Sequence, residues 1–78
     1  MTLQQITPVA VNSTLLRSVS YDITLSILEL EFRDGALYRY LDVPETIYTG
    51  LIAADSKGYY FNRSVRPCFR YALIREPQ

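Results

Sequence analysis

Two runs of alternating apolar and polar residues flank the dipeptide Asp34-Gly35, and this arrangement predicts a β-hairpin. A two-residue loop at this dipeptide would place Arg39 on the apolar face of the hairpin. A three-residue loop over 33–35, with the glycine in the left-handed conformation, instead sets Glu29 opposite Arg39. Because a shift of one residue moves every side chain to the other face, only the second register separates apolar from charged residues. We therefore predict the three-residue loop with a glycine bulge.

The remaining periodicity predicts an α+β fold with one antiparallel sheet and a helix packed on one of its faces. The expected elements are a three-stranded antiparallel meander over 15–21, 25–33 and 36–41, a helix over 44–55, a short helical turn over 59–65 and a final strand over 69–75. Pro44 and Glu45 favour a helix start, because proline fits the first turn and an acid favours the positive end of the helix dipole. Gly58 is expected to end this helix in the left-handed conformation.

The chain of 78 residues has no internal repeat, which predicts a single domain with a thin core. We expect residues 1–13 to form a flexible N-terminal arm and residues 14–76 to form the domain. No apolar run approaches the roughly 20 residues that span a bilayer, and no signal-peptide pattern is found, so no membrane partner is expected. The single cysteine, Cys68, excludes an internal disulfide framework and indicates a reducing, cytoplasmic setting.

Residue types that most enzymes need are missing. The chain has no histidine and one cysteine, which excludes a Cys–His dyad, a Ser–His–Asp triad and a structural zinc site. The three glycines form no phosphate-binding loop. Glu29 and Glu31 share a strand face, but Arg39 lies across the ladder and both acids are expected in solvent, whereas a catalytic acid is buried. We therefore expect no enzyme, no cofactor and no metal ion.

The net charge of zero is the sum of two unlike halves. Residues 18–55 hold two arginines and seven acids, a sum of −5, whereas residues 56–75 hold one lysine, four arginines and no acid, a sum of +5. In the second segment the cations alternate with aromatic rings, and arginine with tyrosine suits the phosphates and unpaired bases of single-stranded RNA. The candidate RNA-binding residues are Lys57, Tyr59, Tyr60, Arg63, Arg66 and Arg70.

Two other interpretations of this charge pattern stay open. The basic and acidic halves can neutralise each other within one folded chain. The basic end can also dock on an acidic surface, either of a protein partner or of a second copy in a homodimer. In both the RNA and the protein-partner interpretations, the chain is a non-catalytic binding module.

Tyr38 and Tyr40 also allow two interpretations. In the predicted register Tyr40 pairs with Leu28 and Tyr38 with Leu30, so both rings point toward the helix and pack in the core. The other interpretation places them on an open sheet face, where aromatic side chains stack on bases. The sequence favours the core.

A set of short motifs runs through most of the chain. They are Tyr21-Asp22, the strand 28–32, Asp34-Gly35, Tyr38-Arg39-Tyr40, Val43-Pro44, Tyr48, Leu51, Ala54, Ser56, Gly58, Phe61-Asn62, Val65-Arg66, Phe69 and Tyr71. With these spacings the chain resembles the KTSC domain in its stand-alone form, over roughly residues 11–75. The resemblance implies a small bacterial or phage protein, and it implies RNA binding by analogy with the lysyl-tRNA synthetases that carry this domain at their C-terminus. Pro67-Cys68 and the N-terminal arm depart from the family pattern without affecting the expected fold.

Overall fold

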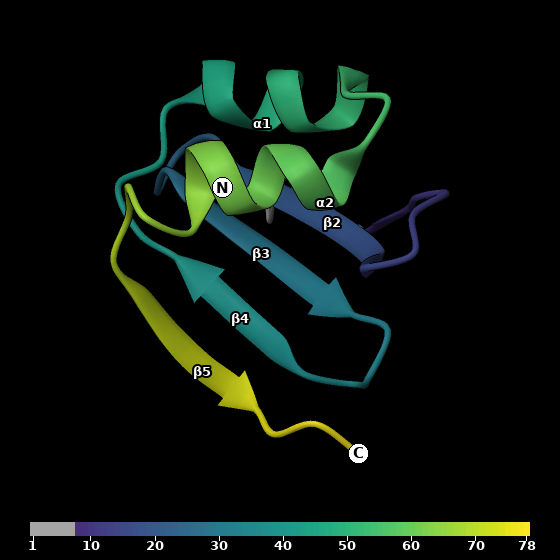
Figure 1. Cartoon of the computed structure of the whole chain (residues 1–78). Coiled ribbons are helices and arrows are strands. Elements are labelled where there is room, and N and C mark those ends of the chain that lie inside the picture. The colour runs from purple at the N-terminus through teal and green to yellow at the C-terminus, as the bar shows by residue number, and fades with distance from the viewer. Residues whose placement is uncertain (1–7) are drawn as a thin grey trace.

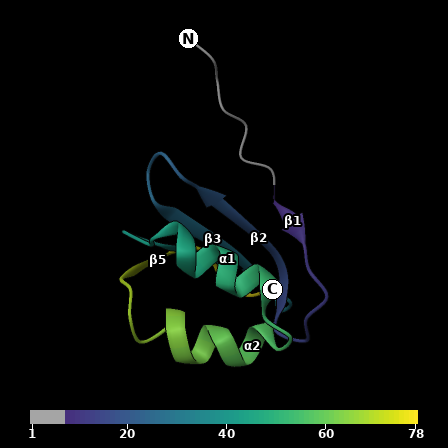
Figure 2. The same ribbon diagram turned by 90° about the horizontal axis from the view of Figure 1, so that it is seen from above.

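The computed structural model of the chain describes residues 8–78 and confirms the α+β fold. One five-stranded antiparallel sheet has the strand order β1 (Val9–Ala10), β2 (Leu16–Asp22), β3 (Ile27–Phe32), β4 (Leu37–Tyr40) and β5 (Tyr71–Arg75). The helical elements between β4 and β5 are α1 (Glu45–Ala53), α2 (Lys57–Tyr60) and the π-helical turn η1 (Phe61–Val65). Figures 1 and 2 show that they lie on one face of the sheet. None of the helices in the described part of the chain is long and apolar enough to cross a membrane.

The hairpin between β3 and β4 has the register that alternation predicts. Gly35 adopts a φ of +94°, and the Phe32 amide donates to the Ala36 carbonyl over 2.8 Å. Glu29 lies opposite Arg39, and the two side chains form an ion pair of 2.7 Å on the face without helices. The three-residue loop with a left-handed glycine is therefore confirmed.

The core lies between the sheet and the helical layer. Its buried members are Leu16, Val19, Leu28, Leu30, Tyr40, Val43, Leu51, Phe61 and Val65. The sheet contributes five of them from β2, β3 and β4, whereas all five residues of β5 are exposed. The helices thus cover the middle of the sheet and leave its β5 edge bare.

The sheet has more strands than the predicted meander. Val9 and Ala10, within the segment expected to be a flexible arm, pair with Val19 and Ser18 of β2. The final strand begins at Tyr71 and pairs with β4, so it extends the meander. Residues 1–7 of the predicted arm lie outside the described residues. A two-residue strand has too little alternation to be found from sequence.

The predicted role of Gly58 at the end of the first helix is wrong. Helix α1 ends at Ala53, and the chain restarts as α2 because the Ser56 hydroxyl accepts a hydrogen bond from the Tyr59 amide. Gly58 lies inside this second helix, and Gly35 is the only glycine among residues 8–78 with a positive φ. Asp55-Ser56 is thus a helix start, so the predicted turn over 59–65 begins two residues earlier, at Lys57.

The two helical glycines give a matched test of packing. A Cβ atom on Gly50 would overlap the Tyr60 hydroxyl and lie 2.8 Å from the Tyr60 Cζ atom, whereas a Cβ atom on Gly58 would meet Leu15 at an ordinary 3.6 Å. Gly50→Ala is therefore expected to lower the free energy of unfolding by about 1–3 kcal/mol through overpacking. Gly58→Ala is expected to leave it unchanged or raise it by up to about 1 kcal/mol, because alanine favours a helix.

Urea denaturation of both variants beside the unmodified chain measures these changes. Equal effects of the two substitutions would show that Tyr60 does not need the space above Gly50.

Candidate nucleic-acid interface

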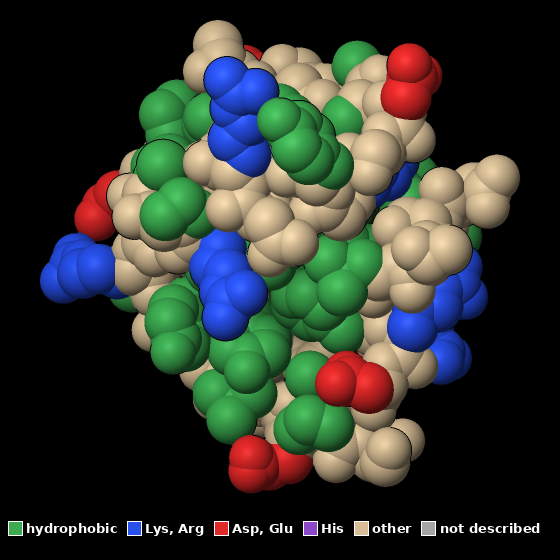
Figure 3. Space-filling view, viewed as in Figure 1, with side chains coloured by type: hydrophobic (Ala, Val, Ile, Leu, Met, Phe, Trp, Pro, Cys, Tyr) green, Lys and Arg blue, Asp and Glu red, His purple; other side chains and the backbone are tan. Residues whose placement is uncertain are grey.

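A groove of about 430 Å³ opens where the helical layer stops short of the β5 edge. Its aromatic lining consists of Phe32, Tyr38, Tyr40, Phe61 and Tyr71. Asn62 and Arg66 reach it from η1 and from the residue that follows η1. Figure 3 shows hydrophobic side chains gathered over this edge of the sheet around a basic side chain. We call this feature the aromatic groove.

The aromatic rings form a graded surface from buried to exposed. Tyr40 is 3% exposed and packs edge-on against Phe61, with ring centroids 5.8 Å apart. Tyr38 is half-buried and stacks beside Tyr40 at 6.2 Å. Tyr71 is 60% exposed and lies 5.4 Å from Tyr38. The floor of the groove is thus filled, while its rim offers ring surface to a ligand.

The core interpretation holds for Tyr40, and Tyr38 packs half-buried against the core on the same helical face, where both rings also line the groove. Burial, supported by the neighbouring Tyr38 and Tyr71 and opposed by Arg66, raises the pKa of Tyr40 to about 12. The Tyr40 hydroxyl is therefore neutral at physiological pH and adds no charge to the groove.

Arg66 is the cation of the groove. It lines the aromatic groove and is exposed, and among residues 8–78 its guanidinium forms no ion pair and no hydrogen bond. The amide of Arg66 donates to the Phe61 carbonyl over 2.9 Å, and this i to i−5 bond defines the π-helical turn. The turn thus holds an unpaired positive charge beside the aromatic rim.

Arg63 and Arg70 are exposed but are not part of the groove lining. Arg63 donates to the Tyr59 hydroxyl over 3.1 Å, and its guanidinium carbon lies 6.0 Å from the centre of that ring. Arg70 pairs with Asp42 over 3.3 Å, but the two side chains are 81% and 82% exposed. Exposed contacts of this kind contribute little free energy, so both guanidinium groups are easily diverted to another anion.

Two further candidates are held in the fold. The Lys57 ammonium group donates to the Ala54 carbonyl over 2.9 Å, beyond the last turn of α1. The Tyr60 hydroxyl donates to the Ile47 carbonyl over 3.1 Å, and its ring packs against the core. Of the six candidate residues, only Arg66 lines the groove.

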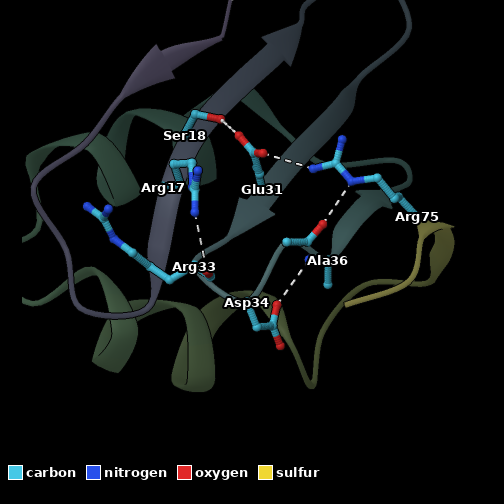
Figure 4. A network of polar contacts seen from close by, with 8 residues as sticks. Arg17, Ser18, Glu31, Arg33, Asp34, Ala36 and Arg75 are labelled. Carbon is cyan, nitrogen blue, oxygen red and sulfur yellow. Dashed lines mark hydrogen bonds and ion pairs between the residues drawn. The ribbon is translucent and has the colours of Figure 1, made fainter. Parts of the chain in front are cut away.

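The face of the sheet without helices holds a separate polar network, drawn in Figure 4. The Ser18 hydroxyl donates to Glu31 over 3.0 Å, and Arg75 pairs with Glu31 over 2.8 Å and donates to the Gly35 carbonyl. The Ser18 hydrogen bond lowers the pKa of Glu31, and Arg75 lowers it further, whereas slight desolvation opposes both. Arg75 is thus neutralised on the far face, and the basic segment forms no continuous patch.

Sequence reasoning missed the contribution of Tyr71, Phe61 and Asn62 to a common site. Phe61 is buried in the core, whereas Tyr71 is 60% exposed, and both line the groove. The usable signal was the alternation of Tyr71 and Leu73 in a strand that ends the chain. A strand at a sheet edge leaves such side chains exposed, but the pairing that puts it there is a long-range contact.

A model of the KTSC domain matches residues 12–71 of the chain. The chain belongs to the KTSC domain family. The crystal structure of a KTSC domain protein from Yersinia pestis superimposes with a TM-score of 0.87 at 31% identity, and the match covers 91% of this chain and 100% of that one. An uncharacterized protein of Stutzerimonas stutzeri is 49% identical over 67 residues, which cover 85% of this chain and 94% of that relative. The resemblance seen in the sequence is thereby confirmed.

The KTSC domain also matches a segment of much longer proteins. A lysine–tRNA ligase of Nostoc sp. is 36% identical over 59 residues, which cover 76% of this chain but 10% of the ligase. KTSC is a domain of unknown function, and the comparisons indicate no catalytic activity. Residues 8–78 contain no group of three or more Asp, Glu, Cys or His side chains that could hold a metal ion.

The raised pKa of Tyr40 predicts a loss of stability in alkali. The folded state favours the neutral phenol of Tyr40. Its contribution to the free energy of unfolding is therefore complete below pH 10 and is lost as the pH rises toward 12. Tyr40→Phe is expected to lose less stability than the unmodified chain over that interval. Urea denaturation at a series of pH values between these limits measures the difference, and Tyr59→Phe, which removes an exposed hydroxyl, is the control. A Tyr40→Phe profile parallel to that of the unmodified chain would contradict the assignment.

Proposed function

We propose that this KTSC domain binds a short segment of single-stranded RNA in the aromatic groove. A base stacks on the exposed ring of Tyr71 at the rim, and the adjoining phosphate binds the guanidinium of Arg66. The observation that carries the proposal is the placement of an unpaired arginine beside an exposed aromatic rim. Arginine with tyrosine is the pairing that sequence-tolerant single-strand binders use.

The depth of the groove sets how a base enters it. Tyr40 and Phe61 are already in edge-to-face contact, so no ring can insert between them. Tyr38 and Tyr71 lie above them with exposed surface, and a base that stacks there brings its polar edge toward the amide of Asn62. The site therefore suits one base and its phosphate, and it does not suit a duplex.

The distribution of charge predicts weak, salt-sensitive binding. Arg66 supplies one phosphate contact, and Arg63 and Arg70 supply two more if they exchange their exposed partners for phosphates. Lys57 is held by the Ala54 carbonyl and adds none. Three contacts on a single strand predict a slope of about −2 for the logarithm of affinity against the logarithm of salt concentration.

Two further facts support RNA as the ligand class. Lysine–tRNA ligases, whose name states that they act on a tRNA, contain a segment similar to this chain. The +5 segment supplies Arg63, Arg66 and Arg70, whereas the acids of the other half lie mainly in β3 and in the loops, and among them Asp34 lines the groove.

Titration of a labelled single-stranded RNA of about eight nucleotides, followed by fluorescence anisotropy at low salt, tests the proposal. Tyr71→Leu keeps an apolar strand residue but removes the ring, and it is expected to weaken binding about tenfold or more. Arg66→Gln is expected to reduce the magnitude of the salt slope by about 0.7, the contribution of one phosphate contact.

The matched controls lie outside the groove. Tyr59→Leu removes an exposed ring and Arg17→Gln removes an exposed arginine of β2, and neither is expected to change affinity as the groove variants do. Single-stranded DNA of the same sequence shows whether the 2′-hydroxyl contributes. No binding at low salt, or equal effects of groove and control variants, would remove the proposal.

A further inference from the structure

The outer edge of β5 is an unpaired strand edge. Strand β5 ends the sheet on one side, and no described residue pairs with its outer side. The opposite end of the sheet is β1, which is only two residues long. Short edge strands are a common protection against association, and β5, with five residues, lacks it.

The backbone groups that this edge presents follow from the ladder with β4. The Leu41 amide donates to the Arg70 carbonyl over 2.9 Å, so Arg70 points its peptide groups toward β4. Hydrogen-bonded and non-hydrogen-bonded pairs alternate in an antiparallel ladder. In the register Tyr40 opposite Tyr71 and Tyr38 opposite Leu73, the amides and carbonyls of Tyr71 and Leu73 therefore point outward.

The side chains along this edge are apolar and exposed. Leu73 is 44% exposed and Ile74 is 43% exposed, beside the more exposed Tyr71. The residues that follow β5 do not cover the edge, because the Gln78 amide donates to the Asp34 carbonyl at the β3–β4 loop. An apolar strand with free donors and acceptors is a surface for another strand.

The edge is complementary to a second copy of itself. Antiparallel pairing centred on Ala72 sets Tyr71 opposite Leu73 of the other copy, twice by symmetry, and joins their outward amides and carbonyls in four hydrogen bonds. Ala72 of one copy then lies opposite Ala72 of the other in a non-hydrogen-bonded pair. The two strands approach most closely there, so a small side chain fits. Tyrosine opposite leucine is a favourable cross-strand pair.

Charge supports the same partner. Antiparallel pairing brings the start of one β5, which carries the exposed Arg70, beside the end of the other, where the exposed Glu76 follows the strand. Arg70 then lies opposite Ile74 of the other copy, near both Glu76 and Arg75, and the charge of Arg75 is already neutralised by Glu31. No like charges stand opposite one another between Tyr71 and Leu73.

We propose that the chain forms a two-fold symmetric homodimer through β5, with Ala72 on the axis and a continuous ten-stranded sheet. Because the axis is perpendicular to the sheet, both helical layers lie on the same side. The two aromatic grooves then face each other across the paired β5 strands and form one trough, with β4 of each copy about 14 Å apart. The dimer does not depend on RNA binding.

Sedimentation equilibrium of the full chain without nucleic acid, over a range up to the millimolar concentrations used in NMR, tests the dimer. The unmodified chain is expected to approach twice the mass of one chain as its concentration rises. Leu73→Lys places a charge on the edge without touching the aromatic groove, and it is expected to give the mass of one chain throughout. Ile52→Lys, the same change at an exposed position of α1, is the control and is expected to dimerise like the unmodified chain.

Cross-linking tests the register in a Cys68→Ser background. A non-hydrogen-bonded pair holds its Cα atoms about 4.5 Å apart, within the range that a disulfide spans. Ala72→Cys is therefore expected to oxidise to a covalent dimer, and Leu73→Cys, which faces Tyr71 of the other copy, is expected to do so far more slowly. A single-chain mass at every concentration, or a dimer indifferent to Leu73→Lys, would overturn the proposal. Faster cross-linking through Leu73→Cys would overturn the register.

Discussion

The register of β3 against β4 determines which face of the sheet is apolar. With Gly35 in the left-handed conformation, Leu28 and Leu30 face the helices while Glu29 and Glu31 face the other side. A slip of one residue would bury both acids beneath α1, at a cost no core of this size could offset. The helical layer, the buried tyrosine and the far polar network all depend on this single loop.

The aromatic groove and the unpaired edge of β5 have one cause, because the helices do not cover the whole sheet. The two helices and η1 together span Glu45–Val65 and pack over β2, β3 and β4, so β5 pairs with the sheet without a layer above it. Where the helical layer stops, the tyrosine rings of β4 pass gradually from core to surface. A domain this small cannot cover five strands, and the uncovered strand is where binding is possible.

Local signals in the sequence predicted the local features of the fold. Alternation and one turn dipeptide were enough for the hairpin register, and the helix over 44–55 is close to the observed Glu45–Ala53. The groove escaped prediction because it needs the pairing of Tyr71 with Tyr40 across thirty intervening residues. Gly58 was misassigned because a serine cap restarts the helix at the point where a glycine usually ends one.

The acidic and the basic half of the chain do not form two separate charged patches, because the sheet distributes their side chains between its two faces. The register shift between Leu37 and Tyr38 places Arg75 opposite Leu37, on the same face as Glu31, so this arginine leaves the side of Tyr71 and Leu73 and is neutralised. Arg66 follows η1 on the helical side and forms no ion pair among residues 8–78, although Asp34 also lines the groove. One irregularity in the β4–β5 ladder thus separates a structural arginine from one that is free to bind an anion.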